Sequence, residues 1–167
     1  MGTIPNGSIH ERRRGEGFLS AVAVGGFFIL LGIVYIAAPN LLSDANKFFK
    51  DFTALQVPGT SIQLPAPANP ASHAELYGAV AEFTLGMSIL QVVLLALSLA
   101  LQSSTRRTGE TVGNLVFWFG ATYLIMTLLN DTTTVKTWFI FWAAIVMVWG
   151  ASMIARALFL LARRRTI

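Results

Sequence analysis

The sequence contains no cysteine and only two histidines, His10 and His73, among its 167 residues. Disulfide bonds, thiolate catalysis, cysteine-ligated zinc and iron–sulfur clusters are therefore excluded. One chain also cannot supply the histidines of a multi-histidine metal site or a bis-histidine haem. We accordingly predict no bound metal or cofactor, while the apolar spans leave room for contact with a lipid or a quinone.

Charged residues are also scarce, at 12% of the chain, whereas hydrophobic residues make up 54%. An average soluble domain carries about 25% charged residues. The charges that remain avoid four long windows, which predicts a polytopic membrane protein. The net charge of +4 does not indicate nucleic-acid binding, because nearly all of the arginines stand just outside the apolar runs.

Enzyme motifs are missing as well. The chain has no glycine-rich phosphate loop, no H-E-x-x-H, no G-x-S-x-G and no paired intramembrane aspartates. The segments outside the apolar runs are short tails and loops, which leave no room for a separate catalytic domain. These absences favour a protein that is not catalytic by itself.

The chain does contain four apolar runs, at about 18–38, 75–101, 112–129 and 137–162. About 20 apolar residues cross the hydrocarbon core as a helix. We therefore predict a single all-α membrane domain over residues 1–167, with four transmembrane helices in an up-down bundle. Tails at 1–17 and 163–167 and an outer loop at 39–72 complete this arrangement.

The distribution of arginines predicts the orientation. Three arginines precede the first run, two lie between the second and third, and three follow the fourth. Four spans bring all three groups to one side of the membrane, and positive charge is typical of the cytoplasmic side. We expect an integral membrane protein with both termini in the cytoplasm and the 39–72 loop outside.

Within that outer loop, residues 43–56 have the pattern of an amphipathic helix. Phe48, Phe49, Phe52 and Leu55 fall on one helical face. We expect the helix to lie on the outer membrane surface or to cover the mouth of the bundle.

The second span is preceded by Ser72-His73-Ala74-Glu75, which fits the S-x-x-E capping box. In that motif the serine and the glutamate each satisfy an exposed backbone amide at the helix start. We therefore assign Ser72 and Glu75 a structural role, and expect His73 to be solvated at the membrane interface.

Glu82 is the most unusual residue, because it is a carboxylate inside an apolar run. Its face also carries Glu75, Gly78 and Gly86, and we expect this face to pack inward. Three interpretations stay open. Glu82 is a hydrogen-bonded packing residue, a site for an ion or proton, or the partner of a group on another subunit.

Gln91 and Arg156 are the other intramembrane candidates. Gln91 lies nine residues after Glu82, on the opposite side of its helix, which suggests that the helix is contacted from two directions. Arg156 is expected near the cytoplasmic end, at a different depth from Glu82, so that its side chain reaches the headgroups instead of bridging to Glu82.

Two functional hypotheses follow. The first is a non-catalytic accessory or structural subunit of a larger membrane complex, for example a respiratory or oxidoreductase assembly. The alternative is a small oligomeric ion- or proton-coupled transporter or channel that uses Glu82. In both cases the predicted partners are the lipid bilayer and other membrane subunits or further copies of the chain, and no nucleic acid.

Overall fold

The computed structural model describes residues 7–164 and is mostly helical. Four helices are long and apolar enough to cross a membrane, as predicted, and a helix, a two-stranded hairpin and a short 3-10 turn lie between the first two of them. In chain order the elements are α1 (Gly7–Ala37), α2 (Leu41–Lys50), β1 (Phe52–Gln56), β2 (Gln63–Pro67), η1 (Pro70–His73), α3 (Ala74–Ala100), α4 (Thr105–Leu128) and α5 (Val135–Arg164).

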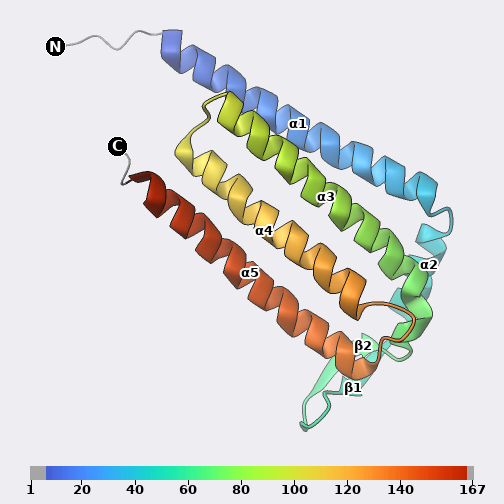
Figure 1. The fold of residues 1–167 in the computed structure, drawn as a ribbon. Coiled ribbons are helices and arrows are strands. Elements are labelled where there is room, and N and C mark those ends of the chain that lie inside the picture. The colour runs from blue at the N-terminus through green and yellow to red at the C-terminus, as the bar shows by residue number, and fades with distance from the viewer. Residues whose placement is uncertain (1–6, 165–167) are drawn as a thin grey trace.

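The four long helices lie side by side in one layer, in the order α1, α3, α4, α5 (Figure 1). Consecutive long helices run in opposite directions, and extensive packing joins each to its neighbour in the row. We expected a bundle, in which the last helix closes back on the first. Instead α1 and α5 occupy the two edges of the layer, which leaves both of its faces open within the described structure.

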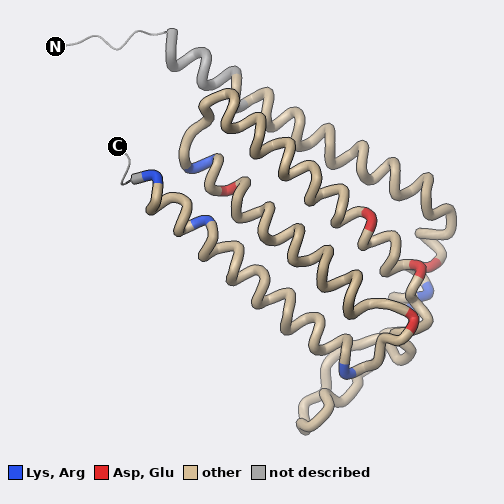
Figure 2. Tube along the Cα trace, viewed as in Figure 1, with Lys and Arg blue, Asp and Glu red and all other residues tan. Residues whose placement is uncertain are grey.

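Arginines gather at one end of this layer, together with Glu110, whereas lysines and most of the carboxylates lie toward the other end (Figure 2). One end carries Arg106, Arg107, Arg156 and Arg163, and we call it the arginine end. The other, which we call the hairpin end, carries α2 and the β1–β2 hairpin. Helices α1, α4 and α5 extend beyond the predicted spans, because hydropathy marks only the apolar part of a helix, whereas α3 matches its span to within one residue. At the arginine end, α1 begins at Gly7 instead of following a tail over 1–17, and α4 begins at Thr105 instead of 112.

Glycines set the close approach of neighbouring helices. A Cβ atom at Gly86 of α3 would stand 2.5 Å from a methyl group of Leu30 in α1, and one at Gly26 of α1 would stand 2.6 Å from a methyl group of Leu90 in α3. Each helix therefore inserts a leucine over a glycine of the other. Such small residues let helix backbones come close in the absence of a hydrophobic drive between helices.

The prediction of one helix over residues 43–56 is wrong in its second half. Helix α2 ends at Lys50, and β1 pairs in antiparallel fashion with β2 from Phe52↔Pro67 to Gln56↔Gln63. The turn of this hairpin contains Gly59 at φ 81°, a conformation that glycine adopts without steric cost. The spacing of the aromatic residues fits a helix, but the backbone hydrogen bonds to β2 come from a segment that local periodicity does not reveal.

The four residues of the predicted apolar face are consequently separated. Phe48, Phe52 and Leu55 pack against the buried cluster at the hairpin end, whereas Phe49 is 72% exposed. Phe48 reaches this cluster from α2, and Phe52 and Leu55 reach it from β1. Phe48, Phe52 and Leu55 therefore pack against one cluster although they do not lie on one helix, and Phe49 does not reach that cluster.

The predicted capping box is also corrected. Ser72 lies in η1, where its hydroxyl donates to the carbonyl oxygen of Asn69 at 2.7 Å. Helix α3 begins at Ala74, after His73, with no side-chain hydrogen bond at its cap. The turn that starts at Pro70 uses Ser72 before the long helix begins, so Glu75 lies in the first turn of α3 without a reciprocal serine.

Candidate functional site

Glu82 lies on the exposed face of α3 together with Gly78, Leu85 and Ile89, which corrects the expectation that this face packs inward. Gly78 and Ala79 line the same pocket as Glu82, and Gly86, one helical turn further on, packs against Leu30 of α1, so the carboxylate stands at the border of the contact between α1 and α3. Among residues 7–164 no hydrogen bond or ion pair to the Glu82 carboxylate is formed.

The surroundings of Glu82 are acidic. It lines a pocket of about 290 Å³ with Asp44 of α2 and Glu75 of α3, next to Ala37 and Asn40 at the end of α1. Glu82 therefore stands near the level at which α1 ends, although it is eight residues into α3. At about 1.5 Å per residue this is roughly 12 Å from the start of α3.

Arg156 pairs with Glu110 of α4 and not with Glu82. Its Nη2 atom donates to Oε1 of Glu110 at 2.8 Å, and Arg106 reaches the same oxygen at 3.3 Å. The lack of a side chain at Gly113 lets α5 come close to α4 beside the ion pair between Arg156 and Glu110. A Cβ there would lie 3.1 Å from the backbone oxygen of Ser152 and 3.3 Å from Cβ of Arg156, so α5 approaches α4 closely just beside the ion pair.

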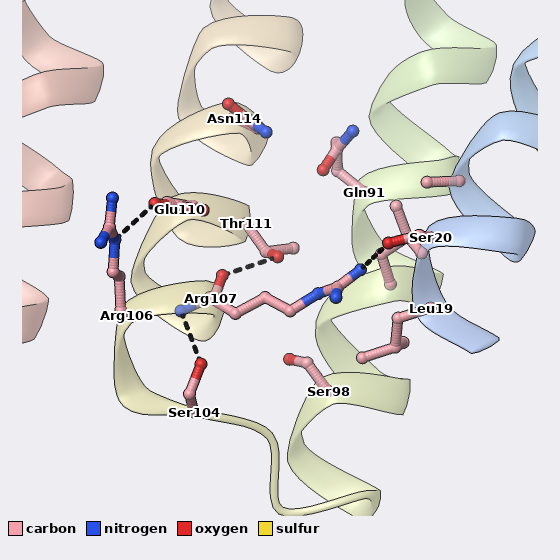
Figure 3. Close-up of a pocket in the computed structure, with 12 residues that line it drawn as sticks. Leu19, Ser20, Gln91, Ser98, Ser104, Arg106, Arg107, Glu110, Thr111 and Asn114 are labelled. Carbon is pink, nitrogen blue, oxygen red and sulfur yellow. Dashed lines mark hydrogen bonds and ion pairs between the residues drawn. The ribbon is translucent and has the colours of Figure 1, made fainter. Parts of the chain in front are cut away.

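A polar cavity of about 490 Å³ lies between α1, α3 and α4 toward the arginine end (Figure 3). Its wall combines apolar side chains with hydroxyl, amide and charged groups. The lining residues are Leu19, Ser20, Ala23, Gln91, Leu94, Ser98, Ser104, Arg106, Arg107, Glu110, Thr111 and Asn114.

Arg107 spans this cavity from α4 toward α1. Its Nη2 atom donates to the hydroxyl of Ser20 at 3.1 Å, and its backbone N–H donates to the hydroxyl of Ser104, which caps α4. The positive end of the α4 helix dipole and the Arg107 side chain therefore meet at the same end of the cavity, while Arg106 turns away from it toward Glu110 (Figure 3).

Gln91 projects into the cavity from α3 (Figure 3). Only 6% of the residue is exposed, and its side-chain amide forms no hydrogen bond with any residue in 7–164. The neighbouring buried hydroxyls of α3 behave differently. Ser88 donates to the carbonyl oxygen of Thr84 and meets Thr122 of α4 at 3.3 Å, while Ser98 donates to the carbonyl oxygen of Leu95. Gln91 thus stands apart from the polar residues that bond to their own helix.

A second polar centre ties the hairpin end together around Asp51. Its Oδ2 accepts from the backbone N–H of Asn69 at 2.8 Å and contacts Nε2 of His73 at 3.0 Å. These hydrogen bonds, that from Asn69 first, hold the pKa of Asp51 below its usual value. His73 is buried, which corrects the expectation that it is solvated.

Aromatic rings surround this pair. Phe48 contacts the rings of His73, Tyr77 and Trp138 edge to face, with centroids 5.2, 6.2 and 5.8 Å apart. The Tyr77 hydroxyl and the Trp138 indole N–H are buried without a hydrogen-bond partner in the described structure. The cluster joins α2, β1, α3 and α5, and its packed aromatic rings hold these four elements together.

Sequence reasoning missed Glu110, Arg107 and Asp51 as site residues. A signal for Glu110 was present, because Arg106 and Glu110 have the i, i+4 spacing of a helical ion pair and Ser104 is a good N-cap. Placing the helix start at 112 hid that signal. No local signal links Asp51 to Asn69 and His73, which are 18 and 22 residues away. The described residues contain no group of three or more histidine, cysteine or acidic side chains that could hold a metal ion.

The fold and the sites define a class of protein: a helical protein with four helices that are long and apolar enough to cross a membrane. Comparisons of the chain with protein-family models, with curated proteins and with solved structures each found no match. The functional conclusion therefore rests on the chain itself.

Proposed function

We propose that this protein is a non-catalytic accessory or structural subunit of a larger membrane assembly, in which another protein covers the exposed face of α3. The observation that carries the proposal is Glu82. It stands on an exposed face of a helix that is long and apolar enough to cross a membrane, and it forms no ion pair or hydrogen bond with the described residues.

The energetic argument concerns the ionised carboxylate. Inside the hydrocarbon region such a group costs several kcal/mol unless it is paired, protonated or hydrated. The nearest polar side chains along its pocket, Asp44 and Glu75, are also acidic and cannot compensate its charge. A donor on a neighbouring subunit, either another protein or a second copy of this chain, would remove that cost.

The single layer of helices supports the same conclusion. With α1 and α5 at opposite edges, α3 and α4 are covered by neighbours in the row but not across the faces of the layer. A second layer from a partner would convert this row into the usual two-layer packing of a domain. The short segments outside the helices, and the absence of an enzyme motif in the sequence, favour a supporting role.

The proposed topology follows from charge. The arginine end would face the cytoplasm, with both termini there, and the α2–hairpin segment would lie outside. Helix α2, with Phe48 turned to the cluster and Phe49 exposed, would lie across the outer ends of the long helices as an amphipathic element.

The direct test places a photo-crosslinking amino acid at Ile89, on the Glu82 face, in otherwise native membranes. We expect a crosslink to one protein in a fixed ratio, and expect Glu82→Gln to reduce its yield several-fold. Asp131→Asn makes the same chemical change in an exposed loop and should leave the yield unaltered. Crosslinks to lipid alone, together with a monomeric mass in native nanodiscs, would rule out the subunit role.

A second candidate is a small oligomeric ion- or proton-coupled transporter, favoured by the three carboxylates of Asp44, Glu75 and Glu82 in one pocket. One layer of four helices does not enclose a pathway, so this function requires several copies. Proton or cation flux into liposomes that Glu82→Gln abolishes would support it. Flux equal to that of protein-free liposomes would reject it and leave the subunit proposal standing.

A further inference from the structure

We infer that the polar cavity between α1, α3 and α4 binds the headgroup and glycerol region of an anionic phospholipid. The observation behind this inference is a built site. Residues from three helices line an open cavity of about 490 Å³, a volume within the roughly 300–1,000 Å³ of small-molecule pockets. The inference does not depend on the proposed subunit role.

The end of the cavity near Gln91 is suited to a ligand group that forms hydrogen bonds. Gln91 is more than nine-tenths buried and points into the cavity, and its amide has no hydrogen bond with the described residues. The polar atoms of this amide are not themselves fully buried, so a group that enters the cavity can reach them. An ester carbonyl or a glycerol oxygen is the type of group that its N–H would bind.

The end of the cavity near Arg107 is suited to an anion. Arg107 and the N-terminus of the 24-residue helix α4 bring positive charge there, whereas Arg106 turns to the other side of α4, toward Glu110 (Figure 3). Glu110 also lines the cavity, but Arg106 and Arg156 both contact its carboxylate, which compensates its charge. Ser20 positions the Arg107 guanidinium between α1 and α4, where a phosphate would meet it.

The separation of the two ends fits an amphiphile. Ser98 and Gln91 on α3 are seven residues apart, as are Arg107 and Asn114 on α4, which corresponds to roughly 10 Å along each helix. Both walls therefore change together from hydroxyl and guanidinium groups to carboxamides, with Leu19, Ala23 and Leu94 contributing apolar contact. A phosphate followed by ester groups matches this order, and the volume leaves the acyl chains in the bilayer.

The experiment measures lipid binding by native mass spectrometry on delipidated full-length protein. Phosphatidylglycerol and phosphatidylcholine with the same acyl chains are titrated separately. We expect phosphatidylglycerol to bind at least tenfold more tightly. Arg107→Gln should remove most of that preference, whereas Gln91→Leu should weaken both lipids several-fold and preserve the preference. Lys136→Gln removes an equal charge at the hairpin end and should change neither affinity.

Inorganic phosphate distinguishes the two sources of a phosphate group. If millimolar phosphate raises the unfolding temperature of the wild-type protein as much as phosphatidylglycerol does, and Arg107→Gln abolishes both effects, the site takes a free anion and the lipid inference is overturned. Equal binding of the two lipids by the wild-type protein, a result that needs no variant, also overturns it. An equal loss in Lys136→Gln and Arg107→Gln would reduce the effect to general surface charge.

Discussion

Gly113 provides the sharpest test of how the layer is assembled. It lies in α4 where the backbone of α5 comes close, and an added Cβ would stand 3.1 Å from the backbone oxygen of Ser152. A backbone atom of a long helix cannot rotate away as a side chain can. Gly113→Ala must therefore push α5 outward by a few tenths of an ångström, next to the Glu110–Arg156 ion pair.

Two opposing effects decide the magnitude. Overpacking a close contact costs about 1–3 kcal/mol, whereas alanine in a helix is favoured over glycine by about 1 kcal/mol. Gly150→Ala separates them, because Gly150 lies in α5 and a Cβ there meets nothing within 4 Å. Helix propensity affects both variants alike, so the difference between them reports the contact. We expect Gly113→Ala to be less stable than Gly150→Ala by about 1–3 kcal/mol.

The assay is reversible unfolding in mixed detergent micelles with increasing dodecyl sulfate, followed by tryptophan fluorescence and circular dichroism. Both signals should give the same transition if unfolding has two states. Equal free energies of unfolding for Gly113→Ala and Gly150→Ala would refute the close approach of α4 and α5 at this position.

Three further predictions follow from the packing. Gly86→Ala should destabilise the protein by about 1–3 kcal/mol, and Leu30→Ala should largely remove that effect, because the two residues share one contact; a double-mutant cycle without coupling would contradict it. Glu110→Gln should cost under about 1 kcal/mol in the same unfolding assay, since both partners are about two-fifths exposed; a cost of several kcal/mol would mean the pair is desolvated by a partner. Asp51 should stabilise the fold at pH 7, measured as the difference in unfolding free energy between the wild-type protein and Asp51→Asn, and this difference should shrink below pH 3.8. The reason is that the lowered pKa makes the folded state bind the proton less readily than the unfolded chain does. A difference that grows in acid would contradict this prediction.

The four long helices could be predicted from sequence because the signal is local. Each apolar run is long enough to cross a bilayer, and no distant contact is needed to recognise it. Their ends could not be predicted equally well. The first two turns of α4 contain Arg106, Arg107 and Glu110, so hydropathy excludes them although Ser104 caps the helix.

The hairpin and the cavity depend on contacts that sequence patterns do not contain. Phe48, Phe49, Phe52 and Leu55 fit a helical face, yet the chain leaves the helix after Lys50 because Asp51 accepts from Asn69 and β1 pairs with β2. The sequence placed Gln91 and Glu82 on opposite sides of α3. It could not reveal that Gln91 enters a cavity with Arg107 while Glu82 stays on the exposed side.

If both proposals hold, these opposite positions on α3 give the helix two separate tasks. Toward α1 and α4, helix α3 forms one wall of the cavity that contains Arg107. On its exposed face it carries Glu82, whose pocket also contains Asp44 and Glu75. An anionic lipid suits only the first of these sites, because the acidic pocket of Glu82 would repel it. A partner with a cationic or hydrogen-bond donor group suits only the second. A protein with both would be held by lipid at the arginine end and by its partner near the hairpin end, and Arg107→Gln and Glu82→Gln should then impair lipid binding and partner binding independently of one another.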